Sequence, residues 1–188
     1  MIARSSLTRS IALFAGVLVV AGCAGHSAPG RAHLQTEVQN LGWDVAQAES
    51  DLIVVRLDIG EQKRRVRQAL ADLLLTRAAP ARARCSTARA ASKDAGHAAD
   101  GLTAVRNDDG RVEVDLAYIS RDLASLGRDL RRSSIDQNER QQFARFAAHG
   151  RREVRTLENQ GTASLKEVTH LRDVIDRFVQ QANAACAS

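Results

Sequence analysis

The sequence is poor in aromatic residues and in proline. Phe, Trp and Tyr together make up 3% of the 188 residues, and there are only two prolines. Large rings usually fill the interiors of β-sandwiches, β-barrels and α/β enzyme cores, so their scarcity argues against all three. Alanine makes up about a sixth of the chain, which favours helix. The composition therefore indicates an all-α protein.

The sequence also lacks the motifs that carry known catalytic chemistry. It contains no G-x-S-x-G, no phosphate-binding loop and no paired catalytic Cys and His. The five histidines are scattered and have no spacing typical of metal ligands: His26, His33, His97, His149 and His170. We expect a non-enzymatic protein with no catalytic residue, no bound metal and no cofactor.

The N-terminus has the parts of an export signal. Arg4 and Arg9 precede an apolar run over residues 11–20, which is too short to span a bilayer as a mature helix. The run ends in Val20-Ala21-Gly22-Cys23, which resembles the lipobox of bacterial lipoproteins. This resemblance implies cleavage before Cys23 and lipidation of its sulfur and new amine. The alternative is an ordinary secretory signal with a chance cysteine.

The resemblance also implies boundaries within the chain and a cellular location. We expect a signal peptide over residues 1–22, a lipid-anchored flexible tether over 23–30 and a helical bundle over 31–188. Ala24 stands where an Asp usually marks retention in the inner membrane. The resemblance therefore implies an outer-membrane anchor facing the periplasm, or the outer face of the cytoplasmic membrane in a single-membrane cell.

Three long helices follow from heptad periodicity. Apolar residues recur at steps of four and three over three stretches, which predict helices at about 31–79, 81–132 and 134–185. Pro80 separates the first two, and Ser134 with Gln137 predicts a capping box for the third. Short connections make neighbouring helices antiparallel, which predicts an elongated three-helix bundle or coiled-coil rod. Many core-facing side chains of the third helix are small, which predicts either close approach or loose packing.

A polar cluster interrupts the second periodic stretch. The residues Asn107-Asp108-Asp109-Gly110 are typical of a turn, although the heptad phase continues across Asp109. We expect one bent helix, and a four-helix bundle is the alternative if the chain breaks at 106–111. Asp109 occupies a core-facing position opposite Gly161, so we expect a weak layer with Asp109, Gly110 and Gly161 as a hinge. A calcium loop is excluded, because Val105 and Leu116 would fall where carboxylate ligands are required.

Two cysteines remain after Cys23. Cys85 lies just beyond the Pro80 turn, and Cys186 ends a third helix that returns to the same end of the bundle. The topology therefore predicts a disulfide between Cys85 and Cys186, since the envelope is oxidising. Two free thiols buried as small apolar groups are the alternative.

Two aromatic residues fall outside the core-facing positions. Trp43 and Tyr118 are candidate partner contacts, because Trp and Tyr are enriched where partners bind. The alternative is that Trp43 covers a groove between helices. Basic and acidic residues are interleaved and aromatics are few, so we expect no nucleic-acid binding.

The sequence therefore predicts a lipid-anchored structural or interaction module of the cell envelope. Its partners would be the membrane, through Cys23, and an envelope protein. The alternative function is a pilotin-like or chaperone accessory that binds a client helix in a groove. The same heptads also allow self-association as an intermolecular coiled coil.

Overall fold

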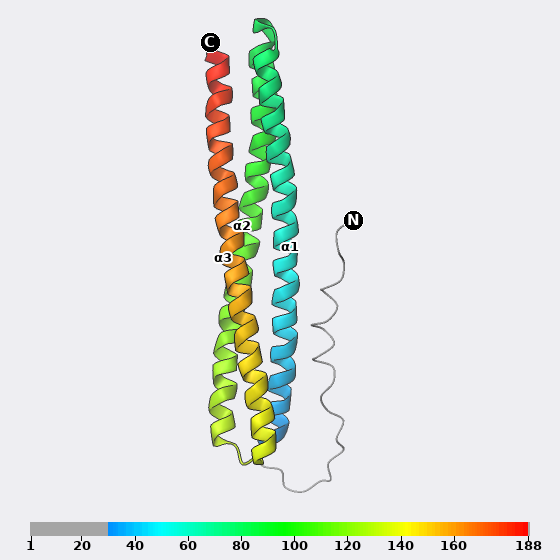
Figure 1. Cartoon of the computed structure of the whole chain (residues 1–188), viewed down its shortest axis with the longest axis vertical. Coiled ribbons are helices and arrows are strands. Elements are labelled where there is room, and N and C mark those ends of the chain that lie inside the picture. The colour runs from blue at the N-terminus through cyan, green and yellow to red at the C-terminus, as the bar shows by residue number, and fades with distance from the viewer. Residues whose placement is uncertain (1–29, 188) are drawn as a thin grey trace. The chain divides into compact units, whose positions relative to one another are not determined.

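The computed structural model describes residues 30–187, which form three long helices. They are α1 (Gly30–Ala78), α2 (Ala81–Arg132) and α3 (Gln137–Ala187). Helix α2 packs antiparallel to both α1 and α3 (Figure 1). No strand occurs within this part of the chain. The predicted all-α class with three antiparallel helices is confirmed.

Helix α2 continues without a break through the polar cluster at its centre. Val105 and Val112, on either side of the cluster, are both buried, so the helix keeps one face toward the core. Asp108 accepts a hydrogen bond from Arg111 one turn later, with Oδ1 3.3 Å from Nη1. Core packing on both sides outweighs the turn propensity of Asn, Asp and Gly here. The four-helix alternative, with a break at 106–111, is wrong.

Proline sets the boundary between α1 and α2. A residue before proline is disfavoured in helix, and α1 ends at Ala78, two residues before Pro80. The Pro80 carbonyl then accepts hydrogen bonds from the backbone N–H groups of Ala83 and Arg84, at 2.8 and 3.2 Å. Pro80 lacks an N–H, which a helix N-terminus would leave unpaired in any case.

The predicted cap of α3 is wrong by two residues. The helix begins at Gln137, and the carboxylate of Asp136 accepts the backbone N–H of Glu139 at 2.9 Å. Asp136 with Glu139 has the same spacing as Ser134 with Gln137, and its negative charge interacts more favourably with the helix N-terminus. Ser133 directly follows α2, and its hydroxyl donates to the Leu130 carbonyl at 2.9 Å.

Contacts group the described residues into two compact units, each built from one part of every helix. The first unit holds residues 30–48 and 115–155, and the second holds 49–114 and 156–187. The apolar residues predicted to face the core line both interiors, which confirms the heptad assignment. In the first unit the buried apolar residues are Leu34, Leu41, Val45, Ala48, Leu116, Ile119, Leu123, Leu126, Leu130, Ala147 and Val154.

The core of the second unit combines large side chains from α1 and α3 with a run of alanines from the first half of α2. Its largest cluster of buried apolar residues comprises Val55, Ile59, Val66, Ala69, Leu73, Ala88, Ala91, Ala95, Ala98, Leu102, Val105, Val168, Leu171, Ile175, Phe178 and Ala182, and Leu52, Val112 and Leu157 are buried in the same unit. The run of alanines on α2 leaves room for Phe178 and the branched side chains of its neighbours. Burying each large side chain stabilises the fold by about 1.5–3 kcal/mol.

Gly150 marks a point of close packing in the first unit. A Cβ atom at this position would lie 3.0 Å from Cδ2 of Leu123, whose side chain is 1% exposed. The missing side chain therefore lets the leucine of α2 seat against the backbone of α3. Of the two possibilities left open by the sequence, close approach is correct here.

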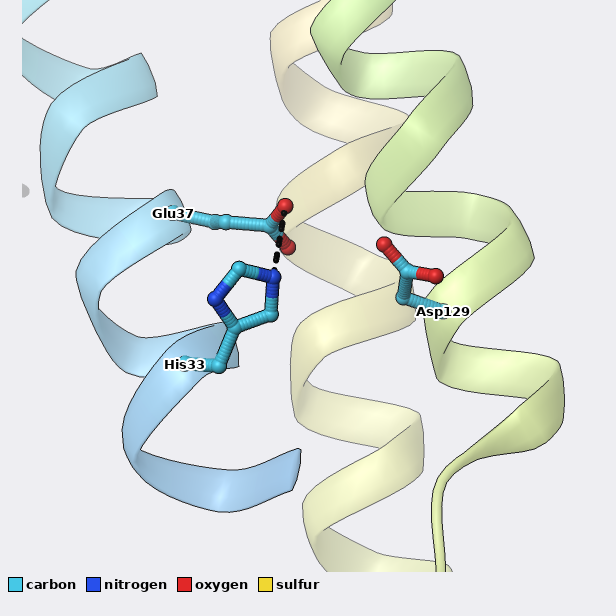
Figure 2. Close-up of side chains that lie close together, drawn as sticks. All are labelled: His33, Glu37 and Asp129. Atoms are coloured by element: carbon cyan, nitrogen blue, oxygen red, sulfur yellow. Dashed lines mark ion pairs between the residues drawn. The ribbon is translucent and has the colours of Figure 1, made fainter. Parts of the chain in front are cut away.

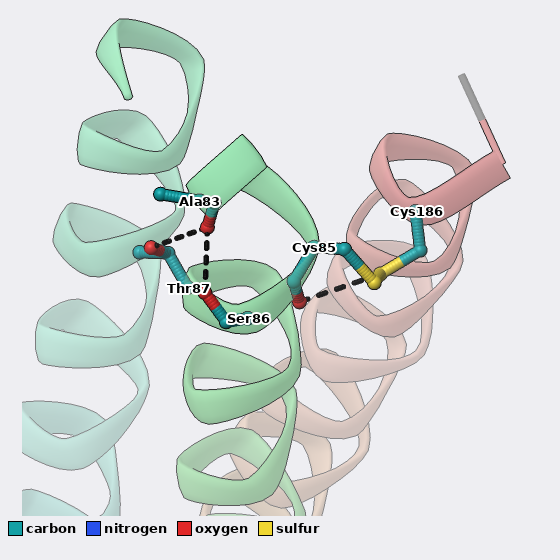
Figure 3. Close-up of a disulfide and its surroundings, with 5 residues drawn as sticks. All are labelled: Ala83, Cys85, Ser86, Thr87 and Cys186. Carbon is teal, nitrogen blue, oxygen red and sulfur yellow. Dashed lines mark hydrogen bonds between the residues drawn. A yellow bond between two sulfur atoms is a disulfide. The ribbon is translucent and has the colours of Figure 1, made fainter. Parts of the chain in front are cut away.

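A disulfide joins Cys85 of α2 to Cys186 of α3, as predicted (Figure 3). The two Cα atoms are 4.4 Å apart, and 101 residues separate the cysteines in sequence. In the same turns of α2, the hydroxyls of Ser86 and Thr87 both donate to the Ala83 carbonyl, at 2.8 and 2.9 Å. The bond holds the end of α3 to the first turns of α2 within the second unit.

Candidate functional site

Helix α1 exposes large apolar side chains on its outward side in the second unit. We call these residues the apolar face of α1: Ile53, Val54, Leu57, Leu70, Leu74 and Leu75. Leu57, Leu74 and Leu75 are each more than 60% exposed. On α2, the same unit shows one comparable exposed residue among those described, Val114. Apolar side chains gathered outside a core mark interaction surfaces more often than scattered single ones do.

The apolar face arises because α1 carries apolar residues in addition to those of its heptad. Val55 and Ile59 are buried at core-facing positions, while the nearby Val54 and Leu57 point outward. Packing within one unit requires a helix to bury only one apolar stripe. The second apolar surface of α1 therefore has no partner within the second unit.

Basic side chains separate the two halves of the apolar face. Arg64 and Arg67 are exposed between Leu57 and Leu70. Their neighbours are already paired within the chain: Lys63 Nζ lies 2.6 Å from Glu167 Oε1, and Arg65 Nη2 lies 2.5 Å from Glu61 Oε1. Along α1 this surface therefore carries one apolar group, then basic residues, then a second apolar group.

The two aromatic residues singled out in the sequence both lie in the first unit and are exposed. Trp43 on α1 is 77% exposed and Tyr118 on α2 is 58% exposed. A ring that covered a groove would be largely buried, so the exposure of Trp43 does not fit that alternative. Their role as partner contacts stays a prediction.

The proposed hinge residues lie in the second unit. Asp109 is 7% exposed, and its Oδ1 atom is shielded from solvent without a hydrogen-bond partner. A Cβ atom on Gly161 would lie 3.6 Å from this oxygen, so the two residues face each other as expected, whereas Gly110 borders open space. Burial raises the pKa of Asp109, and the nearby Glu113 carboxylate raises it further. A polar layer is therefore present in the core, while a hinge at this layer stays a prediction.

A shallow groove lies between α1 and α3 in the second unit. It has a volume of about 450 Å³, and its small lining residues are Gly60, Ala163 and Ser164. Arg56 and the Lys63–Glu167 ion pair line the remainder. This space accommodates a few side chains and has a charged rim, so it is a poor receptor for the apolar stripe of a long client helix.

One group of metal-type ligands comes together in the described residues, and the sequence analysis missed it. His33 and Glu37 on α1 lie beside Asp129 on α2 in the first unit (Figure 2). Burial raises the pKa of Glu37; His33 opposes this rise, while Asp129 and Asp122 add to it. The i, i+4 spacing of His33 and Glu37 was a signal in the sequence, but the approach of Asp129 depends on how α1 and α2 align.

No protein-family model matches the chain, and no curated protein matches it. Cys23 and the rest of the lipobox-like segment lie outside the described residues. Within residues 30–187, no helix has an apolar stretch long enough to cross a membrane.

Proposed function

We propose that this chain is a lipid-anchored, non-enzymatic interaction protein of the bacterial cell envelope. In this proposal Cys23 attaches it to the membrane, and the apolar face of α1 binds a partner protein. The observation that carries the proposal is the set of large apolar side chains exposed on α1 outside its packed heptad positions. Large apolar side chains gathered on an exposed helix face are costly in water unless a partner covers them.

The lipobox-like sequence supports the anchor. Each buried acyl CH₂ group contributes about 0.8 kcal/mol, so the two or three chains of a mature lipoprotein hold a protein firmly on a membrane. Ala24 favours the outer membrane, facing the periplasm. Anchoring confines the protein to a surface and raises its effective concentration near partners on that surface.

The partner that fits the apolar face is an acidic amphipathic helix. Ile53 and Leu57, like Leu70 and Leu74, are spaced by four residues, which is the spacing at which two helices pack along their length. Arg64 and Arg67 between the two apolar groups favour a partner with carboxylates near its centre. A second copy of this chain fits less well, because it would bring the same arginines together in an antiparallel pair.

The alternative is a pilotin-like or chaperone accessory that receives a client helix in the groove beside Gly60 and Ser164. The small lining residues of that groove favour this function, and its limited volume of about 450 Å³ and charged rim oppose it. The two functions use different surfaces of the second unit, so one experiment separates them.

Site-specific photo-crosslinking in the native envelope tests the proposal. Probes replace Leu57 and Leu74 on the apolar face, Ala163 in the groove and Val114 on α2. We expect Leu57 and Leu74 to capture the same partner protein and Val114 to capture none. Capture at Ala163 alone would assign the function to the groove, and crosslinks between copies alone would show self-association; either result contradicts the proposal.

A matched pair of substitutions then tests whether the contact is apolar. Val54 and Val114 are each 53% exposed and lie in the same unit, one on α1 and one on α2. Val54→Ser should reduce the yield of the Leu57 crosslink several-fold, and Val114→Ser should leave it unchanged. The double substitution Arg64→Glu with Arg67→Glu should also reduce it, by repulsion of an acidic partner. Equal effects of the two valine substitutions would contradict a role for α1.

A further inference from the structure

An imidazole and two carboxylates meet near the start of α1. His33 and Glu37 are one turn apart, and Nε2 of His33 lies 3.2 Å from Oε1 of Glu37. Asp129, near the end of α2, points toward this pair (Figure 2). One ligand atom from each of the three residues lies within 4.8 Å of the other two. The antiparallel packing of α1 and α2 thus assembles three potential ligands from two helices.

The second oxygen of Glu37 has no protein partner. Its Oε2 atom is shielded from solvent and accepts no hydrogen bond. A carboxylate oxygen in this position loses its hydration and gains nothing in exchange, which destabilises the folded state. Asp129 and Asp122 add further negative charge nearby. A cation placed among these groups would satisfy the orphaned oxygen and offset the repulsion between carboxylates.

We propose that His33, Glu37 and Asp129 bind a divalent transition-metal cation, with Zn²⁺ as the best fit. A set of one imidazole nitrogen and two carboxylate oxygens suits Zn²⁺, whereas Ca²⁺ and Mg²⁺ prefer oxygen ligands alone. Ligand atoms on one tetrahedral zinc ion lie about 3.3 Å apart, given bond lengths near 2.0 Å. The three groups approach this separation by side-chain rotation, which is easy for His33 because its ring is 61% exposed.

The ion would act as a clamp between α1 and α2. Two contacts already hold this end of the first unit: Arg31 Nη2 lies 2.7 Å from Glu139 Oε1, and Gly30 packs against Ser133. The first joins the start of α1 to the first turn of α3, and the second places it beside Ser133 in the α2–α3 connection. The metal would add a link to α2 itself, and would stabilise the folded chain because the unfolded chain does not hold the three ligands together.

Metal binding by the purified full chain tests the proposal. The chain carries Cys23→Ser, which removes the one cysteine outside the disulfide, and has no histidine tag. Titration with ZnCl₂ is followed by calorimetry, and thermal unfolding is recorded with Zn²⁺, with Mg²⁺ and with a chelator. We expect one equivalent of Zn²⁺ to bind, with a rise in Tm of several degrees that Mg²⁺ does not produce.

Three substitutions identify the ligands, and one pair in the same unit provides the control. His33→Gln, Glu37→Gln and Asp129→Asn should each weaken Zn²⁺ binding at least tenfold. His149 and Glu153 have the same i, i+4 spacing, with Nε2 3.1 Å from Oε1, but belong to no three-ligand group among the described residues. His149→Gln should therefore leave the affinity unchanged. Circular dichroism in the absence of metal confirms that each variant folds.

Two results would overturn the metal site. One is the absence of saturable binding near one equivalent in the folded full chain. The other is binding that Asp129→Asn leaves intact, because the site requires the ligand from α2. Asp129→Asn preserves size and shape, so a loss of folding does not obscure this outcome.

Discussion

Cys85 and Cys186 are joined across 101 residues of sequence, with their Cα atoms 4.4 Å apart. This bond ties the last turns of α3 to the first turns of α2 in the second unit. It closes a loop that contains most of α2 and nearly all of α3. The bond therefore removes much of the conformational freedom of the unfolded chain.

Removal of this bond should lower stability more than any other change to one pair of side chains in the second unit. In the chain-entropy model, closing a loop of about 100 residues stabilises a protein by about 4–5 kcal/mol. We expect Cys85→Ala with Cys186→Ala to reduce the free energy of unfolding by about 4 kcal/mol, measured by urea denaturation.

Reductant provides the control for this measurement. Dithiothreitol should destabilise the native chain by a similar amount and should have no effect on the double variant. An unchanged unfolding curve for the native chain in reductant, with both thiols shown to be reduced by mass spectrometry, would contradict the expected contribution of the bond.

The helices and their core were predictable because heptad periodicity determines which face of a long helix is buried. Leu52, Leu102 and Phe178 are buried as the apolar spacing predicts. The disulfide was predictable for a related reason. Antiparallel topology places Cys85 and Cys186 at the same end, and this conclusion does not depend on the details of side-chain packing.

Other features depend on quantities that periodicity does not contain. The cap of α3 was wrong because Ser134 and Asp136 both begin a capping pattern, and the choice rests on the interaction of a charge with the helix N-terminus. The approach of Asp129 to His33 depends on the alignment of two helices. The apolar face of α1 was missed because Leu57 and Leu74 lie outside the heptad that the sequence analysis followed.

Two glycines should respond in opposite directions to the same substitution. Alanine in a helix interior is favoured over glycine by about 0.5–1 kcal/mol. A Cβ at Gly96 meets nothing within 4 Å, so Gly96→Ala should gain this amount. A Cβ at Gly150 would press on Leu123, which is fully buried and has little room to move, so Gly150→Ala should destabilise the chain.

Thermal unfolding of both variants and of Gly150→Ala with Leu123→Val checks this expectation. The smaller valine should relieve the contact, so the double variant should be more stable than the sum of the two single changes predicts. Stabilisation by Gly150→Ala equal to that by Gly96→Ala would show that α3 and α2 are not in close contact at this point.

Asp109 should be a source of pH-dependent instability. It lies at a core-facing position beside Gly161, and its Oδ1 atom has no hydrogen-bond partner. Replacement of the carboxylate by a neutral amide of the same shape removes the cost of burying a charge. We expect Asp109→Asn to raise the free energy of unfolding by about 1–2 kcal/mol at pH 7.

The gain in stability from Asp109→Asn should disappear in acid, because the pKa of Asp109 is raised in the folded chain. Because the folded state holds this proton more tightly than the unfolded state, protonation stabilises the native chain as the pH falls through the raised pKa toward the ordinary value of 3.8. Below that value both chains carry a neutral side chain, and their stabilities should converge.

Asp108→Asn, at a half-exposed position paired with Arg111, is the matched control and should change stability little at any pH. Denaturation curves from pH 3 to pH 8 give the comparison, and a gain from Asp109→Asn that is constant across this range would show that the carboxylate is hydrated in the folded state.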